Sequence, residues 1–392
     1  MSFESKITRK EFYEKLSRKS GSEATPANAQ TALNNFELYC QHEYKKSIEE
    51  VIDELIKYEK QDGNQNRALI SIDRFCKFLQ EEHPDILVTR NPKSKKKPFQ
   101  VKMPSTIQTY IPYVLRFLRM RGLKISREDI RDFVTMPQII EEEDPEPFTN
   151  EEIRQLCQKA NVQRRLFYMV LKDSALRLME GLSLRKKHIN FTKNPVEINL
   201  PAKYTKGKKK PRLTFLTIET APDLKRLVKN LDEDVPIFAT NSRMKQAISN
   251  EQHYFTRLRQ ELGKENPSFL ERYEHNDRYK KNIHSLRAFC STQAEDAVSE
   301  SFAHGLLGHK KYLGQYIRNK KKTIERYKTL EPKLLVFETI KTENVAQEEI
   351  NNLAEIVKKQ AEQMEELNKN QKIIDELIRK SKQPKLLELL KS

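Results

Sequence analysis

The chain has 392 residues and a net charge of +17 at pH 7, so it is long enough for two or more domains with cores of their own. Its four cysteines lie far apart, which excludes a zinc knuckle and a CxxC redox pair and favours a reduced, intracellular protein. No apolar run approaches a membrane span, and the charged N-terminus lacks the core of a signal peptide.

The positive charge is unevenly distributed. The last 52 residues, from Lys341 to Ser392, hold ten basic and ten acidic side chains, so the excess lies in the first 340 residues. A basic excess of this size is typical of proteins that bind a polyanion, usually nucleic acid. The alternative is that the charge serves solubility alone.

The N-terminal part is predicted to be helical. After a leader over residues 1–25, a helical domain over 26–135 shows apolar residues at three-to-four spacing in segments 31–44, 68–82 and 106–122. Between the last two segments lies a basic loop bracketed by prolines. Its central residues are either solvated or hold DNA phosphates, and they are Ser94, Lys95, Lys96 and Lys97.

An acidic, proline-rich linker over residues 136–147 leads into a second domain over 148–338. Thr149 and Glu152 form a capping-box pattern, which indicates that a helix begins there. Residues 164–182 are predicted helical, residues 196–218 alternate around a Lys–Gly turn as a β-hairpin does, and helices resume after Ala221. The fold class is therefore mainly α with a small antiparallel β element (α+β).

The tail over residues 339–392 carries a heptad pattern. Ile350, Val357, Met364 and Ile378 share one position, and Leu353, Leu367 and Ile374 share another. This spacing predicts a coiled coil or a helix docked on a neighbouring protomer, and the alternative is an amphipathic helix packed on its own domain.

Four short stretches carry candidate chemistry. Arg177 stands among apolar residues, where either Glu180 pairs with it or it binds an anion. Lys206 stands at the hairpin tip, His284 and Arg287 are three residues apart on one predicted helix, and His309 follows a glycine. Nucleotide-binding glycine motifs, a serine-nucleophile motif and a two-metal carboxylate cluster are missing from the sequence, so we expect no metal and no cofactor.

The order arginine, lysine, histidine, arginine, histidine, tyrosine resembles the tyrosine recombinase (phage integrase) family. The matching boxes are "ALRLMEGLSLRKKHINF", "KYTKGKKKPRLTFL", "HSLRAFCSTQ" and "LLGHKKYLGQYIRN", within residues 147–337. The helical domain before them resembles the DNA-clamping domain of the family. The helical tail is similar to that of integrases of archaeal mobile elements.

The resemblance implies a site-specific recombinase that cuts and rejoins DNA through a 3′-phosphotyrosyl intermediate. Arg177 and Arg287 would hold the phosphate, because guanidinium groups bind its oxygens bidentately. Lys206 would act as general acid, His284 would accept or share the proton of the phenol, and His309 would donate a hydrogen bond.

The nucleophile is predicted to be Tyr316, in the tyrosine–apolar–arginine pattern of "QYIRN". Tyr327 is the second choice, although Ile324, Leu330 and Leu334 at helical spacing place it in a core. Tyr312 stands only three residues after His309, too close to reach the same phosphate. Further DNA-binding residues are predicted to be Lys208, Lys209, Lys210 and Arg212.

The expected partner is double-stranded DNA, with four protomers at synapsis, a monomer or dimer when free, and no membrane. The expected location is the cytoplasm, in association with the nucleoid. Two other interpretations stay open: relaxation of DNA in the manner of a type IB topoisomerase, and a DNA-binding protein of the same fold that does not cut.

Overall fold

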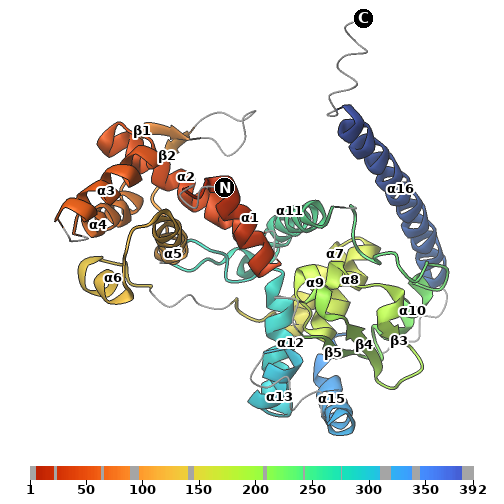
Figure 1. The fold of residues 1–392 in the computed structure, drawn as a ribbon. Coiled ribbons are helices and arrows are strands. Elements are labelled where there is room, and N and C mark those ends of the chain that lie inside the picture. The colour runs from red at the N-terminus through yellow and green to blue at the C-terminus, as the bar shows by residue number, and fades with distance from the viewer. Residues whose placement is uncertain are drawn as a thin grey trace, which may run out of the picture. The chain divides into compact units, whose positions relative to one another are not determined.

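The computed structural model describes residues 6–21, 24–62, 66–88, 97–139, 145–205, 210–241, 243–274, 276–309, 319–337 and 345–381 (Figure 1). The chain divides into two compact units between residues 143 and 144, inside the predicted linker over 136–147. Among the described residues, no helix is both long and apolar enough to cross a membrane.

Unit 1 is a helical bundle with one small hairpin. Its elements are α1 (Arg9–Ser20), α2 (Ala24–Tyr44), α3 (Ile48–Asp62), α4 (Asn66–Gln80), β1 (His83–Val88), β2 (Lys97–Phe99), α5 (Pro104–Arg121) and α6 (Arg127–Phe133). The three helices predicted from apolar spacing are α2, α4 and α5, and they pack on one another. Helix α5 ends where predicted, because Gly122 adopts the left-handed conformation (φ +115°) that ends a helix.

Two parts of unit 1 differ from the sequence prediction. Residues 1–25 are predicted to be a leader, but α1 buries Phe12 and Leu16 fully in the core of unit 1. The basic segment is predicted to be a plain loop between helices, whereas antiparallel strands β1 and β2 flank residues 89–96. None of the β1 side chains is fully buried, so the hairpin has only a weak sequence pattern and apolar spacing does not reveal it.

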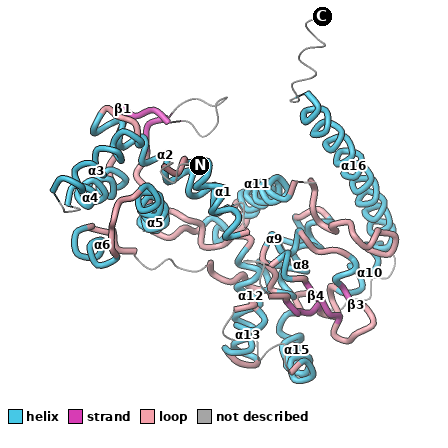
Figure 2. The backbone as a smooth tube through the Cα atoms, viewed as in Figure 1, coloured by secondary structure: helices cyan, strands magenta, loops and turns pink. Residues whose placement is uncertain are grey.

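Unit 2 surrounds a three-stranded antiparallel sheet with helices (Figure 2). Its helices are α7 (Asn150–Lys159), α8 (Val162–Ser174), α9 (Leu178–Leu182), α10 (Ala221–Leu227), α11 (Met244–Leu262), α12 (His284–Ala297), α13 (Glu300–Leu306), α15 (Lys320–Leu334) and α16 (Val345–Ser381). Its strands are β3 (Ile189–Asn190), β4 (Val196–Leu200) and β5 (Arg212–Leu216), and short 3₁₀ turns span Lys186–His188, Ala202–Tyr204 and Pro267–Leu270. The predominance of helices over small antiparallel sheets confirms the predicted fold class.

Local patterns in unit 2 lead to the expected elements. The Thr149 hydroxyl accepts a hydrogen bond from the Glu152 N–H at 3.2 Å, and Glu152 accepts one from the Thr149 N–H at 2.8 Å, which completes the capping box of α7. Strands β4 and β5 pair in register from Val196–Leu216 to Leu200–Arg212, as the predicted hairpin requires.

The helix predicted over residues 164–182 is broken into α8 and α9. Ala175 ends α8 in the left-handed conformation, with φ +49° and ψ +26°. This conformation is unusual for a residue with a side chain and costs free energy. Because the helix ends here, the backbone carbonyls at the end of α8 are free of helical hydrogen bonds, and those of Ser174 and Ala175 accept hydrogen bonds from Arg212.

The first part of the tail packs on its own unit. Helix α16 contacts α10 and α8, and Val357 is 3% exposed in the core of unit 2. Further along the helix, Leu367 and Ile373 are 61% and 54% exposed. The predicted amphipathic pattern therefore covers two stretches: one docked within the chain and one that faces solvent.

Candidate active site

The first arginine box lies at the start of α9, where Arg177 and Glu180 are joined twice. The Arg177 backbone N–H donates to Glu180 Oε2 at 2.9 Å, and Arg177 Nη1 donates to Glu180 Oε1 at 3.1 Å. Glu180 is 1% exposed, whereas the Arg177 side chain is 26% exposed. Arg177 thus has a carboxylate partner inside the fold and still reaches solvent, where it can meet an anion.

Arg212, at the start of β5, is the second arginine on Glu180. Its Nη1 donates to Glu180 Oε2, and its Nη2 donates to the carbonyls of Ser174 (3.2 Å), Ala175 (2.6 Å) and Leu306 (2.8 Å). The sequence predicts Arg212 as a DNA contact, but the residue is 3% exposed. Because these acceptors hold its guanidinium in the interior, we assign Arg212 the role of positioning Glu180, and the DNA-contact prediction is wrong for this residue.

Arg287, from the H-x-x-R box on α12, joins the same group of carbonyls. Its Nη1 donates to the Ala175 carbonyl and its Nη2 to the Leu307 carbonyl at 2.6 Å. The Ala175 carbonyl therefore accepts from both Arg212 and Arg287. The left-handed break at the end of α8 is what turns this carbonyl toward the two arginines.

Two histidines complete the cluster. His309 Nδ1 and His304 Nδ1 are 2.9 Å apart, and His304 Nε2 lies 3.2 Å from the Glu300 carboxylate. One of the two Nδ1 atoms carries the shared proton. A neutral His304 that donates from Nε2 to Glu300 has a lone pair at Nδ1, so His309 then donates from Nδ1 and keeps a lone pair on Nε2. A protonated His304 reverses this, and His309 Nε2 becomes a donor.

The electrostatics of this arginine–histidine cluster (Arg177, Glu180, Arg212, Arg287, His304, His309) favour an anion. Three guanidinium groups face one carboxylate, so three positive charges and one negative charge leave a net charge of +2. Burial, then Arg212 and Arg177, lower the pKa of Arg287. Burial, then Arg287 and His304, lower the pKa of His309. Both pKa shifts indicate an excess of positive charge in a partly desolvated site. The negative charge of a bound phosphate would compensate for this excess.

For Glu180, the neighbouring positive charges outweigh the effect of burial on its pKa. Burial alone would raise its pKa, but Arg212 and the hydrogen bond from the Arg177 N–H outweigh burial and hold the pKa below its usual value. Glu180 therefore stays ionised and keeps two arginines in place.

His284 is the first residue of α12 and is exposed, with its backbone N–H bonded to the Asn282 side chain at 2.8 Å. It precedes Arg287 by three residues, so the two lie on one face of α12.

Tyr327 lies in the core of unit 2. It is fully buried on α15, and its hydroxyl donates to the carbonyls of Asp173 and Phe215 at 3.2 and 3.3 Å. A phenol held in this way is shielded from solvent, and it lies in the core as the helical spacing around it predicted.

Other predicted residues lie outside the part of the chain that the structure describes. These are Ser94, Lys95, Lys96, Lys206, Lys208, Lys209, Tyr312 and Tyr316. Lys97 and Lys210 are described and are exposed at the ends of two of those segments.

Sequence reasoning missed His304 and misplaced Arg212. His304 follows Glu300 by four residues and precedes His309 by five, which is an ordinary pattern for a surface helix. Arg212 looked like the end of a basic run, and alternation along the strand places it on the same face as Thr214 and opposite Leu213, so the sequence gave no sign that its side chain points inward.

Comparison with known proteins gives a family match for part of unit 2. The family model described as "Phage integrase family" matches residues 146–323, which contain the whole arginine–histidine cluster. No curated protein matches the chain in a sequence comparison.

Solved structures are similar at low identity. The Tn1549 transposon integrase in complex with transposon right end DNA is 14% identical, with 75% of this chain and 98% of that chain covered and a TM-score of 0.39. XerA recombinase is 18% identical, with 76% and 93% covered and a TM-score of 0.32. The Tn1549 integrase with circular intermediate DNA is 15% identical, with 82% and 99% covered and a TM-score of 0.37.

The match of the family model to residues 146–323 spans the arginine boxes and the histidine box in the predicted order. Residues 146–323 therefore form a domain of the phage integrase family, the tyrosine-type site-specific recombinases.

Proposed function

We propose that this chain cuts and rejoins double-stranded DNA by transesterification through a 3′-phosphotyrosyl intermediate. The observation that carries the proposal is the cluster of three guanidinium groups around the buried carboxylate of Glu180, which together have a net charge of +2. A phosphodiester brings one negative charge, and more charge builds on its non-bridging oxygens in the transition state. Preorganised cations stabilise that state more than the ground state.

In this proposal, Arg177 and Arg287 hold the non-bridging oxygens. Arg177 is partly exposed, and Arg287 is fixed by two backbone carbonyls, so neither needs to reorganise much when DNA arrives. Arg212 does not touch the substrate: it holds Glu180 and the Ala175 carbonyl, and through them the other two arginines.

His309 adds a hydrogen-bonding group whose state is set by His304. With its pKa lowered by burial and by Arg287, His309 is neutral at pH 7, and its Nε2 is a donor or an acceptor according to the proton on His304. As a donor it would bind a phosphate oxygen, and as an acceptor it would take the proton of the phenol.

Tyr316 would supply the nucleophile and Lys206 the proton. The tyrosine oxygen forms a bond to phosphorus while the bond to the 5′ oxygen breaks, and Lys206 protonates that leaving oxygen. The reverse attack, by a 5′-hydroxyl of another strand, rejoins the DNA. One ester replaces another at each step, so no nucleotide hydrolysis is required. Four protomers on two duplexes would complete the exchange.

The test uses nicked duplexes that cover the DNA flanking the gene of this protein. A nick next to the cleaved phosphate lets the short 5′-hydroxyl fragment diffuse away, so the covalent adduct accumulates. We expect an adduct that retains the 5′-labelled strand, is destroyed by protease, and forms in EDTA without ATP. An adduct on the 3′-labelled strand would contradict the 3′-phosphotyrosyl assignment.

Three tyrosine variants locate the nucleophile. Tyr316→Phe should abolish the adduct, while Tyr312→Phe and Tyr327→Phe should form it. Normal adduct formation by Tyr316→Phe would exclude Tyr316. Relaxation of supercoiled plasmid without any sequence requirement would favour the type IB topoisomerase interpretation instead.

A further inference from the structure

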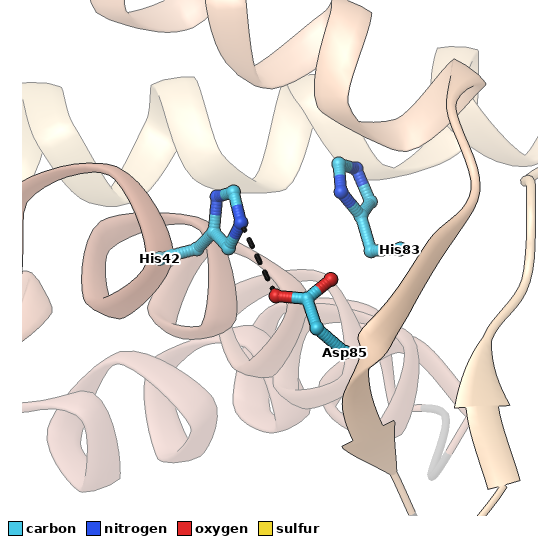
Figure 3. Close-up of side chains that lie close together, drawn as sticks. All are labelled: His42, His83 and Asp85. Carbon is cyan, nitrogen blue, oxygen red and sulfur yellow. Dashed lines mark ion pairs between the residues drawn. The ribbon is translucent and has the colours of Figure 1, made fainter.

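A separate group of potential metal ligands lies in unit 1. His42, near the end of α2, and His83 and Asp85, on β1, bring one ligand atom each to within 4.8 Å of one another (Figure 3). His42 Nε2 and Asp85 Oδ2 are 3.6 Å apart, and the rings of His42 and His83 are 5.3 Å apart between centroids. Neither the family resemblance nor the sequence pattern pointed to these residues, because 41 positions separate the two histidines.

The hydrogen bonds of the two histidines fix which nitrogen has a lone pair. His83 Nε2 lies 2.9 Å from the Phe78 carbonyl, which can only accept, so Nε2 carries the proton and Nδ1 has the lone pair. His42 Nδ1 lies 3.0 Å from the Glu43 carboxylate, so Nδ1 carries a proton. Histidines that bind metals donate their second N–H to a carboxylate or carbonyl in this same way, which orients the ring and raises its basicity.

The His83 ring is also held by packing. It stacks on Phe78 with 4.1 Å between ring centroids and 20° between planes, and it meets the edge of Phe99 on β2 at 5.6 Å. A ring fixed on both sides loses little conformational entropy when it binds an ion.

When His42 is neutral, no hydrogen atom lies between His42 Nε2 and the carboxylate of Asp85. With its proton on Nδ1, His42 presents a lone pair at Nε2 toward a carboxylate oxygen, and two lone pairs repel each other. A second proton on His42 or a cation between the two atoms would remove this repulsion. The nearby His83, which offers another lone pair, favours the cation.

The geometry is close to that of a bound ion. A tetrahedral ion with bonds of about 2.0–2.1 Å places its ligand atoms roughly 3.3–3.4 Å apart. The His42–Asp85 distance of 3.6 Å nearly meets this value, and the widest separation of 4.8 Å must close. Asp85 is 67% exposed on β1, so its side chain is the one that can move.

We propose that His42, His83 and Asp85 bind a divalent transition-metal ion such as zinc, with water as a fourth ligand. Imidazole suits zinc and its neighbours, and two histidines with one carboxylate is an established donor set for such ions. The ion would join the end of α2 to β1, the strand that leads into the basic segment with Lys95 and Lys96. It therefore fixes the start of the hairpin and takes no part in cutting DNA.

The test measures metal binding by the full chain after chelator treatment. Cobalt is the spectroscopic probe, because tetrahedral cobalt absorbs visible light, and zinc is titrated in competition with it. We expect one tight cobalt site, displaced by zinc, and a rise in melting temperature with zinc. His42→Asn, His83→Asn and Asp85→Asn should each weaken binding at least tenfold, and Glu43→Gln by about tenfold, because it orients His42.

Matched controls separate this site from other histidines. His253→Asn on α11 and Asp132→Asn on α6 replace exposed residues of the same types and should bind cobalt as the unchanged chain does. His304→Asn tests the histidine pair in unit 2 and should also leave the cobalt spectrum unchanged. No binding by the full chain, or unchanged binding by Asp85→Asn and His42→Asn with circular dichroism showing both folded, would overturn the proposal.

Discussion

Glu180 and Arg177 are joined through both the backbone and the side chain of the arginine, at 2.9 and 3.1 Å. The same carboxylate also accepts from the buried Arg212. One acidic residue thus holds two of the three guanidinium groups of the cluster, although it would not touch DNA itself.

Glu180→Gln should damage both stability and DNA cleavage. A neutral amide leaves the buried Arg212 without its charge partner, and breaking a buried ion pair costs roughly 3–5 kcal/mol in unfolding free energy. Urea unfolding measures this loss. Glu251→Gln is the matched control. Glu251 is also buried (3% exposed) and also pairs with an arginine, Arg164, at 2.9 Å, but neither residue belongs to the arginine–histidine cluster. At a temperature where both variants are folded, only Glu180→Gln should lower adduct formation; equal adduct yields would remove Glu180 from the site.

Tyr327→Phe should lower stability and leave cleavage intact. Its hydroxyl donates to the buried carbonyls of Asp173 and Phe215, and its loss leaves these acceptors unsatisfied, which costs about 1–3 kcal/mol. Thermal unfolding and the adduct assay on nicked duplexes measure the two effects. If Tyr327→Phe stayed as stable as the unchanged chain but formed no adduct, the phenol would be the nucleophile and the buried conformation would not be the active one.

His304 should tune the pH dependence of cleavage. The pKa of His309 is lowered by burial, by Arg287 and by His304, so His304→Asn removes one of these causes and raises that pKa. If cleavage needs neutral His309, the acid limb of the pH–rate profile shifts to higher pH. We also expect a rate loss of about tenfold to a hundredfold, below that of a group that transfers the proton itself.

DNA affinity provides the control for His304→Asn. A residue that acts only by orienting His309 should leave binding of the uncut duplex unchanged, because no phosphate contact is lost. An unchanged pH–rate profile would mean that the 2.9 Å contact between the two Nδ1 atoms has no role in the reaction.

His188 should make the protein sensitive to mild acid. Burial, then Arg185 and Lys187, lower its pKa to about 4, and its Nδ1 accepts from the Arg185 N–H at 3.2 Å. The unfolded chain takes up this proton near pH 6.5 and the folded chain only near pH 4. The contribution of His188 to the free energy of unfolding is therefore fully present above pH 6.5 and is lost as the pH drops toward 4.

His188→Asn tests this assignment, because an asparagine oxygen can accept the same N–H without titrating. Denaturant unfolding at a series of pH values should show a shallower decline between pH 6.5 and 4 for the variant. An equal slope for both proteins would assign the acid sensitivity to other groups.

The sequence was sufficient where chemistry or local geometry is written into neighbouring residues. The capping box at Thr149 and the glycine stop at Gly122 depend on a few adjacent positions, so they could be predicted. Arg177, Arg287 and His309 were predicted because four boxes resemble one family in the right order, and the structure brings their side chains near one another. The sequence did not predict where some side chains lie. Arg212 points into the core because the helix break at Ala175 exposes backbone carbonyls to it, and no local pattern predicts a contact between residues so far apart in sequence.

The tail offers a prediction that separates packing within the chain from assembly. A chain that ends before residue 345 loses Val357, which is 3% exposed against unit 2, and should lose about 1.5–3 kcal/mol of stability. A chain that ends after residue 366 keeps Val357 and loses the exposed Leu367 and Ile373 together with one exposed hydrogen bond, from Arg243 to Gln371 at 3.2 Å, so its melting temperature should change little.

Sedimentation on DNA then decides what the exposed stretch does. If Leu367 and Ile373 join protomers, the chain that ends after residue 366 should bind a single site normally and form fewer tetramers, because exposed apolar side chains on a helix gain free energy when another helix covers them. The double variant Leu367→Gln with Ile373→Gln should reproduce this effect in the full-length chain, while the exposed Ile356→Gln, beside the docked stretch, serves as the control. Normal tetramers from both the shortened chain and the double variant would show that assembly depends on other surfaces.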